Sequence, residues 1–254
     1  MNKTIFITGG ASGIGLGVAQ HLGQQGHHII IADLNLTAAQ DACNALSENG
    51  VSTQAVQLDV GNIEQIGQIN SVLNGQKVDV LINNAGIQHV SKLEEFPPEK
   101  WQLLINIMLV GPALLTQQFL PSMREQNFGR IINVGSVHSL VASPFKSAYV
   151  AAKHGLLGFA KTIALETGDC DVTINTLCPA YVKTPLVEKQ IAAQAIEHGL
   201  SEADVVNKIM LEPMPKKAFI DPVELAQTAE FLMSSAAKNI TAQTLVLDGG
   251  WTAR

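Results

Sequence analysis

The residues of this chain that could do chemistry are concentrated between Ser136 and Lys153. Tyr149 and Lys153 are four residues apart, so on a helix both side chains would project from the same face. A phenol has an unperturbed pKa of about 10, and a neighbouring ammonium group lowers that pKa by stabilising the phenolate. We therefore expect Lys153 to lower the pKa of Tyr149 so that it can exchange protons, and Ser136 to hold a substrate oxygen beside it.

A Tyr-x-x-x-Lys spacing is weak evidence by itself, because most isolated pairs of this kind are a half-buried tyrosine and a solvated lysine. The fold that positions the pair has to support it. The chain has 254 residues and 46% of them are hydrophobic, which suits one domain with a large core. Strand-like and helix-like segments alternate along it, as in a doubly wound α/β protein. We expect a single Rossmann-type domain over residues 1–254, with a parallel sheet and helices on both faces.

The expected elements follow from hydrophobic periodicity and capping residues. Expected strands span residues 5–8, 28–33, 51–56, 78–82, 130–134, 172–177 and 244–247. Expected helices span residues 14–25, 37–48, 62–73, 101–126 and 147–166, with Thr37 capping the second of them and a further helix beginning at Asp221-Pro222. Residues 184–214 are polar, helical in composition and inserted where the sheet would otherwise continue, so we expect a helical lid over the substrate.

Composition excludes several kinds of partner. There are 16 Lys and Arg against 22 Asp and Glu, a net charge of -6, and no basic cluster that would bind nucleic acid or a membrane surface. No apolar run looks long enough to span a bilayer, and no signal peptide is visible. Cys43, Cys170 and Cys178 lack metal-ligand spacing, and their odd number argues against a complete disulfide framework. We expect a cytoplasmic protein that binds small molecules and holds no metal.

A glycine-rich turn follows the first strand, where dinucleotide folds hold a pyrophosphate at a helix N-terminus. A purely structural turn is the alternative. Asp33, at the end of the second strand, could bind the adenosine ribose and would repel a 2′-phosphate, which favours NAD over NADP; it could also be an ordinary capping residue. The expected cofactor residues of the first four strands are Gly9, Ser12, Gly13, Ile14, Gly15, Asp33, Asp59, Val60, Asn84 and Gly86.

Together, the segments Thr8–Gly15 and Asn83–Gly86, Ser136 and the Tyr149-x-x-x-Lys153 pair resemble the short-chain dehydrogenase/reductase family across essentially the whole chain. The resemblance implies that Tyr149 is the general acid and base, that Lys153 lowers its pKa and binds the nicotinamide ribose, and that Ser136 orients the reacting oxygen. It also implies that Val182 and Thr184 contact the nicotinamide, and that the protein is a homotetramer.

Three polar residues lie close in sequence to the catalytic positions: Gln88, His138 and Lys146. A cation with amide and imidazole donors suits a small carboxylate, although each residue alone has an ordinary structural explanation. The segments 86–90, 141–155, 185–191 and 248–251 resemble the family members that interconvert (R)-3-hydroxybutyrate and acetoacetate. That resemblance implies that Gln88, His138, Lys146 and Gln190 bind the carboxylate, and that Trp251 closes the pocket within the chain or across a subunit boundary.

One position departs from the family. Met108 stands where these enzymes usually carry an Asn that supports a proton-relay water, and Asn106 would face elsewhere on a regular helix. Two alternatives stay open beside a family member that binds a small carboxylate, and Met108 bears on the second of them. One is a short-chain 3-oxoacyl or secondary-alcohol dehydrogenase whose substrate lacks a carboxylate. The other is a dinucleotide-binding protein with impaired catalysis.

Overall fold

The computed structural model describes residues 2–253, apart from the side chains at positions 186, 189, 193, 197 and 198. A 7-stranded sheet forms the centre, in the order β3-β2-β1-β4-β5-β6-β7, and its neighbouring strands pair in parallel. The strands are β1 (Thr4–Thr8), β2 (His28–Asp33), β3 (Thr53–Gln57), β4 (Val80–Asn83), β5 (Gly129–Val134), β6 (Val172–Pro179) and β7 (Thr244–Leu247). The strand order reverses between β1 and β4, so their carboxyl ends border the crevice where such sheets bind ligands.

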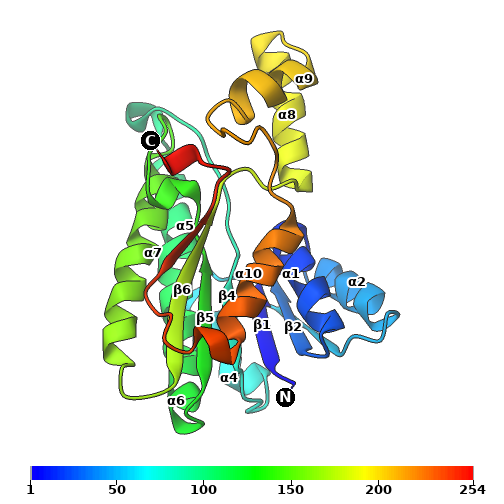
Figure 1. Cartoon of the computed structure of the whole chain (residues 1–254), viewed down its shortest axis with the longest axis vertical. Helices are drawn as coiled ribbons and strands as arrows, with labels where there is room; N and C mark the ends of the chain where they lie inside the picture. Colours follow the sequence, from blue (N-terminus) through cyan, green and yellow to red (C-terminus); the bar gives the residue numbers. More distant parts are fainter. Residues whose placement is uncertain (1, 254) are drawn as a thin grey trace.

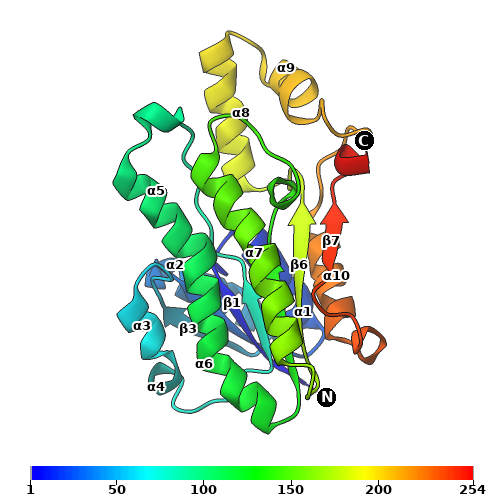
Figure 2. The ribbon, with the colours of Figure 1, turned by 90° about the vertical axis from the view of Figure 1, so that its left-hand side faces the viewer.

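Helices cover both faces of the sheet (Figures 1 and 2). One face is covered by α1 (Gly13–Gln24), α2 (Leu36–Ser47) and α10 (Pro222–Met233), which bury residues such as Leu22 and Leu225. The other is covered by α3 (Ile63–Gly67), α4 (Ile69–Val72), α6 (Gly111–Glu125) and α7 (Ser147–Glu166), with Phe119 fully buried. The sequence prediction of a doubly wound α/β fold is confirmed.

The segment after β6 leaves the body of the fold at the carboxyl edge of the sheet (Figure 1). It consists of α8 (Pro185–His198), α9 (Glu202–Val205) and a π-helical turn, η4 (Val206–Met210). The predicted insertion at 184–214 is therefore helical. Its role as a lid stays a prediction.

The predicted helix at 101–126 begins earlier and contains an irregular turn. It is built from α5 (Pro98–Ile105), the π-helical turn η2 (Asn106–Val110) and α6. Pro112 has no N–H to donate to the carbonyl of Met108 four residues earlier, so the regular ladder is interrupted there. At Gly111 a Cβ would lie 2.4 Å from the carbonyl oxygen of Val60, so the close approach of these two backbones requires glycine.

This composite helix corrects one expectation. Pro98–Glu125 is 28 residues long with a mean hydropathy of 1.6 over its most apolar window, enough to cross a membrane by length and composition alone. The prediction that no apolar run reaches that length is wrong. Leu115, Phe119 and Met123 are buried against the sheet, so the apolar face of this helix belongs to the core.

Two local predictions fail and one is confirmed. Asn35, rather than Thr37, caps α2, because its side chain accepts a hydrogen bond from the N–H of Ala38 at 3.1 Å. The helix predicted at 62–73 is divided into α3 and α4. Asp221 does cap α10, where it accepts from the N–H of Val223 at 2.9 Å.

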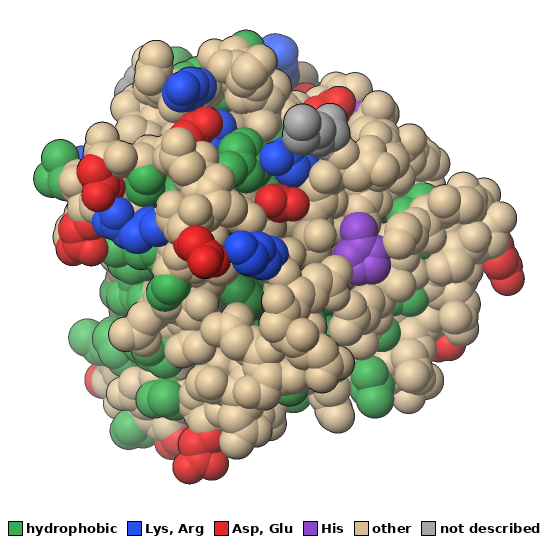
Figure 3. Space-filling view, turned by 90° about the horizontal axis from the view of Figure 1, so that it is seen from below, with side chains coloured by type: hydrophobic (Ala, Val, Ile, Leu, Met, Phe, Trp, Pro, Cys, Tyr) green, Lys and Arg blue, Asp and Glu red, His purple; other side chains and the backbone are tan. Residues whose placement is uncertain are grey.

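Seen from the amino ends of the strands, the molecule carries charges of both signs. Lys, Arg, Asp and Glu side chains are interspersed on this face, and hydrophobic side chains gather along one side of it (Figure 3). Nucleic acid is attracted by a basic patch rather than by mixed charges, so this face offers no such footprint.

Candidate active site

A cavity of about 470 Å³ lies at the carboxyl edge of the sheet, and residues of α8 form part of its wall. The structure brings nearly every predicted site residue into its wall. Gly15 is the exception: a Cβ there would lie 2.3 Å from the carbonyl oxygen of Gly9, so this glycine permits close packing behind the turn. The predicted residues that do line the cavity are Gly9, Ser12, Gly13, Ile14, Asp33, Asp59, Val60, Asn84, Gly86, Gln88, Ser136, His138, Lys146, Tyr149, Lys153, Val182, Thr184, Gln190 and Trp251.

The glycine-rich turn leaves the N-terminus of α1 open towards this cavity. Gly9 and Gly13 have φ values of +60 and +54, a conformation that favours glycine. Ser12 precedes the helix, and within the described part of the chain its side chain caps no backbone N–H. Uncapped N–H groups at a helix N-terminus bind anions, so the turn fits the pyrophosphate of a dinucleotide.

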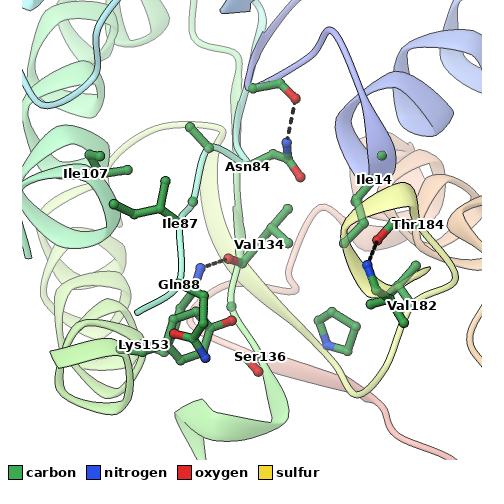
Figure 4. A pocket seen from close by; sticks show the side chains of 18 of the residues that line it. Ile14, Asn84, Ile87, Gln88, Ile107, Val134, Ser136, Lys153, Val182 and Thr184 are labelled. Atoms are coloured by element: carbon green, nitrogen blue, oxygen red, sulfur yellow. Dashed lines mark hydrogen bonds between the residues drawn. The ribbon is translucent and has the colours of Figure 1, made fainter. Parts of the chain in front are cut away.

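Asn84 holds this turn in place. Its side-chain nitrogen donates to the carbonyl oxygens of Thr8 at 2.9 Å and Gly9 at 3.0 Å. Figure 4 shows one of these two hydrogen bonds. The hydroxyl of Thr8 in turn accepts from the backbone N–H groups of Asn84 and Ala85, both at 3.0 Å. The amide donors of Asn84 are thus engaged by the protein, and its contribution is to fix the end of β1 against that of β4.

Two carboxylates lie near the carboxyl edge of the sheet: Asp33 is the last residue of β2, and Asp59 follows the end of β3. Asp33 accepts from the backbone N–H of Ala11 at 3.3 Å and from that of Asn35 at 3.1 Å, so both its oxygens are oriented by the chain. Asp59 accepts from the N–H of Gly61 at 2.8 Å. Ordered acceptors in this position suit ribose hydroxyls and an adenine amine.

Val182 and Thr184 form the opposite wall. Val182 is buried and pairs with Ile220 through an isolated bridge. Thr184 caps α8 by accepting from the N–H of Val187 at 3.4 Å, and its methyl group would be 3.5 Å from a Cβ at Gly13. The base of α8 is therefore next to the open N-terminus of α1 (Figure 4).

Lys153 is held under the cavity floor. Its ammonium nitrogen donates to the carbonyl oxygen of Val134 at 2.7 Å (Figure 4). The same nitrogen lies 5.6 Å from the centroid of the Tyr149 ring. Burial lowers the pKa of Lys153 to about 8, which the neighbouring thiol of Cys178 partly opposes.

Tyr149 differs from the expectation. Burial raises the pKa of its phenol, and a hydrogen bond with Ser136 opposes that change. The predicted lowering of this pKa by Lys153 is therefore not found in the protein without cofactor or substrate. Desolvation of the phenolate outweighs any stabilisation by the ammonium group. The three side chains are nevertheless brought together, as the sequence predicted.

His138 is engaged by two hydroxyl groups. Its Nε2 is 2.7 Å from Oγ of Ser143, and its Nδ1 is 3.4 Å from Oγ of Ser136. Burial, with smaller contributions from Lys146 and His154, lowers the pKa of His138 to about 4, so the ring is uncharged at neutral pH. Contact between His138 and a substrate carboxylate stays a prediction.

Lys146 is half-buried in the cavity wall, and burial lowers its pKa. It follows Phe145, whose φ of +65 is a left-handed conformation that turns the chain into α7. Among the described residues no carboxylate pairs with its ammonium group.

Gln88 and Gln190 also line the cavity, and Oε1 of Gln88 is buried with no hydrogen-bond partner in the described structure. The site thus offers an unpaired cation and two amides.

Aromatic rings form a further part of the cavity wall. Trp251 is edge-on to His138, with ring centroids 5.9 Å apart, and packs against Tyr181. Trp251 therefore reaches the cavity of its own chain. The sequence analysis did not predict Tyr181 or Ser143 as site residues. Tyr181 could have been predicted, because it lies within the Pro179–Thr184 segment that carries Val182 and Thr184.

Met108 is buried beside the cavity and packs with the α7 face that carries Tyr149. Asn106 points away, because its side-chain oxygen accepts from Gln102 at 2.7 Å on the surface. The expectation that Asn106 does not replace the missing amide is met.

The comparisons with known proteins agree with this geometry. A family model described as short chain dehydrogenase matches residues 3–195. The chain is 42% identical to a D-beta-hydroxybutyrate dehydrogenase of Rhizobium meliloti, covering 100% of both, and 42% identical to that of Cupriavidus necator, covering 99% of this chain and 98% of the other. A 3-oxoacyl-(acyl-carrier-protein) reductase of Staphylococcus epidermidis is 31% identical, over 98% of this chain and 99% of its own length. Among solved structures, an actinorhodin polyketide ketoreductase variant with NADPH superposes with a TM-score of 0.93 at 28% identity, covering 100% of this chain and 98% of the other.

Proposed function

Because the chain belongs to the short-chain dehydrogenase family, we propose that it is an NAD-dependent dehydrogenase that interconverts (R)-3-hydroxybutyrate and acetoacetate. The observation that carries this proposal is the ammonium group of Lys146. It is half-buried in the cavity wall without a carboxylate partner among the described residues. A desolvated cation is costly unless an anion joins it, so the site favours a substrate that brings a carboxylate. The two 42% identical relatives carry the name of this activity.

The substrate carboxylate would be fixed by Lys146 and by the amides of Gln88 and Gln190. Charge-assisted hydrogen bonds from several directions orient a small anion as well as bind it. Gln190 lies on α8, so movement of that helix would complete the pocket and exclude water.

The reacting oxygen would lie between Ser136 and Tyr149. In the oxidation, Tyr149 acts as the phenolate and takes the proton of the substrate hydroxyl, while the Ser136 hydroxyl holds the same substrate oxygen. Lys153 is held at 2.7 Å from the carbonyl oxygen of Val134, close to the Tyr149 ring, where its positive charge favours the phenolate once the site is assembled. NAD supplies the hydride acceptor when bound.

Asp33 supports NAD rather than NADP. Its carboxylate, oriented by two backbone N–H groups, would repel a 2′-phosphate. The cationic residues that line the described cavity, Lys146 and Lys153, are placed near Tyr149 rather than near Asp33. The ketoreductase that superposes on this fold was crystallised with NADPH, so assays with both cofactors test the role of Asp33.

The main alternative is a 3-oxoacyl reductase or another secondary-alcohol dehydrogenase. The 31% identical reductase is the observation in its favour. A substrate without a carboxylate would leave the half-buried ammonium group of Lys146 unpaired, which disfavours such a substrate. The third possibility, impaired catalysis, rests on Met108 alone, and Ser136, Tyr149 and Lys153 are all present in the cavity.

We also propose a cytoplasmic homotetramer. Cys43, Cys170 and Cys178 are free thiols, which suits a reducing compartment. β7 is an edge strand, and the hydrophobic side chains of Val246 on it and Phe231 on α10 are 40% and 44% exposed, as at a surface between subunits.

A panel of small alcohols tests the function directly. Both enantiomers of 3-hydroxybutyrate and a neutral secondary alcohol are assayed with NAD and with NADP. The proposal expects the highest kcat/KM for the (R)-acid with NAD. Efficient oxidation of the neutral alcohol without turnover of the acid contradicts it.

A further inference from the structure

Ser143, His138 and Ser136 form a hydrogen-bonded network that ends at the proposed position of the reacting oxygen. Ser143 Oγ is 2.7 Å from Nε2 of His138, and Nδ1 of the same ring is 3.4 Å from Oγ of Ser136. Ser136 Oγ also accepts from the backbone N–H of His138 at 3.2 Å. Ser136 and His138 are buried and Ser143 is half-buried, so these contacts are largely sheltered from water.

The number of protons shared by Ser136, His138 and Ser143 decides whether the hydroxyl of Ser136 is free to donate to the reacting oxygen. A serine hydroxyl has one proton to donate and two lone pairs that accept, and a neutral imidazole has one N–H and one bare nitrogen. One lone pair of Ser136 is filled by the N–H of His138. The second faces Nδ1, so the tautomer of the ring determines whether Ser136 gives or receives in that contact.

With the proton on Nδ1, the ring donates to Ser136 and both lone pairs of the hydroxyl are filled. Its own proton is then left for Tyr149 and the substrate oxygen. With the proton on Nε2, the bare Nδ1 competes for the proton of Ser136, and the reacting oxygen loses that donor. His138 is neutral at pH 7, because its pKa is lowered to about 4.

We propose that Ser143 is a positioning residue that donates its hydroxyl proton to Nε2 of His138, fixes the Nδ1–H tautomer and thereby commits the proton of Ser136 to the reacting oxygen. This inference deepens the proposed function and rests on it for its kinetic consequence. The tautomer itself is independent of any substrate, so the two ideas fail separately. It also gives His138 a role in orienting the catalytic serine rather than in binding the carboxylate.

Imidazole ¹⁵N chemical shifts test the tautomer. They are recorded on histidine-labelled protein at neutral pH, and the His138 signals are assigned by their loss in His138→Asn. The proposal expects the Nδ1–H form in the wild type and a shift towards the Nε2–H form in Ser143→Ala. An Nε2–H ring in the wild type, or an unchanged tautomer in the variant, overturns it.

Kinetics test the consequence. Ser143→Ala should lower kcat by about 10- to 100-fold, the loss that is typical when a hydrogen-bond partner that orients a metal-bound imidazole is removed, with little change in the KM for the dinucleotide. Ser143→Thr keeps the hydroxyl and should restore most of kcat. In a His138→Asn background no Nε2 remains, so Ser143→Ala should have no further effect. Equal losses in the Ala and Thr variants, or additive losses in the double variant, overturn the proposal; if the wild type turns over no substrate, the proposed function fails while the tautomer is still measured.

Discussion

The indole of Trp251 stacks on the phenol ring of Tyr181, with ring centroids 6.0 Å apart and planes inclined by 26°. The two residues are 70 positions apart in the chain, and both line the cavity. Asp248 makes this contact possible. Its carboxylate accepts from the N–H groups of Gly250 at 2.8 Å and Thr252 at 2.7 Å, which fixes the turn that carries the indole.

Removing either the indole of Trp251 or the carboxylate of Asp248 that fixes its turn should open the cavity in the same way. We expect Trp251→Ala to lower kcat/KM by about tenfold, because the loss of an aromatic wall admits water and loosens the substrate. Asp248→Ala should have a similar effect. Because both act through the same turn, the double variant should be little worse than either single one, as a double-mutant cycle on kcat/KM would show. Additive losses contradict a shared role.

Lys146 should control substrate use far more than cofactor binding. Lys146→Ala removes the partner of a desolvated carboxylate, so we expect kcat/KM for (R)-3-hydroxybutyrate to fall by about 100-fold. The Kd for NAD, measured by fluorescence titration, should stay within about twofold. Lys161→Ala, on the exposed side of α7, is the matched control and should leave both unchanged. Parallel losses in hydroxybutyrate use and NAD binding contradict the assignment.

The choice between NAD and NADP should depend on Asp33. Asp33→Asn keeps the size of the side chain and removes its charge, so repulsion of a 2′-phosphate decreases while hydrogen bonds to the ribose weaken. We expect the ratio of kcat/KM for NAD to that for NADP to fall by at least about tenfold. The measurement is a steady-state comparison of the two cofactors at saturating substrate. A wild type that already prefers NADP refutes the interpretation of Asp33.

The elements were more predictable than the contacts between them. Runs such as His28–Asp33 read as buried strands because their β-branched and apolar residues are continuous, and β2 has those bounds. The irregular turn at Asn106–Val110 was not predicted, because it depends on Pro112 and on the approach of Gly111 to Val60, which is distant in sequence. Tyr149, Lys153 and Ser136 were found because their types and spacing match their chemistry. Ser143 and Tyr181 gain their significance from His138 and Trp251, and tertiary contacts of this kind leave no local pattern.

The buried imidazole of His138 should make the folded state sensitive to acid. Its pKa is lowered from 6.5 to about 4, so between these values the unfolded chain binds a proton that the folded protein does not. The free energy of unfolding therefore falls as the pH falls through this window, by at most about 3 kcal/mol from this residue. His138→Gln cannot titrate, so urea unfolding at pH 7.5 and at pH 4.5 should show a smaller loss in the variant than in the wild type. His154→Gln, at an exposed position, should lose nearly as much as the wild type, because burial contributes more than His154 to the lowered pKa of His138. Equal losses in all three proteins mean that His138 does not titrate on unfolding and that the ring is not held neutral by the fold.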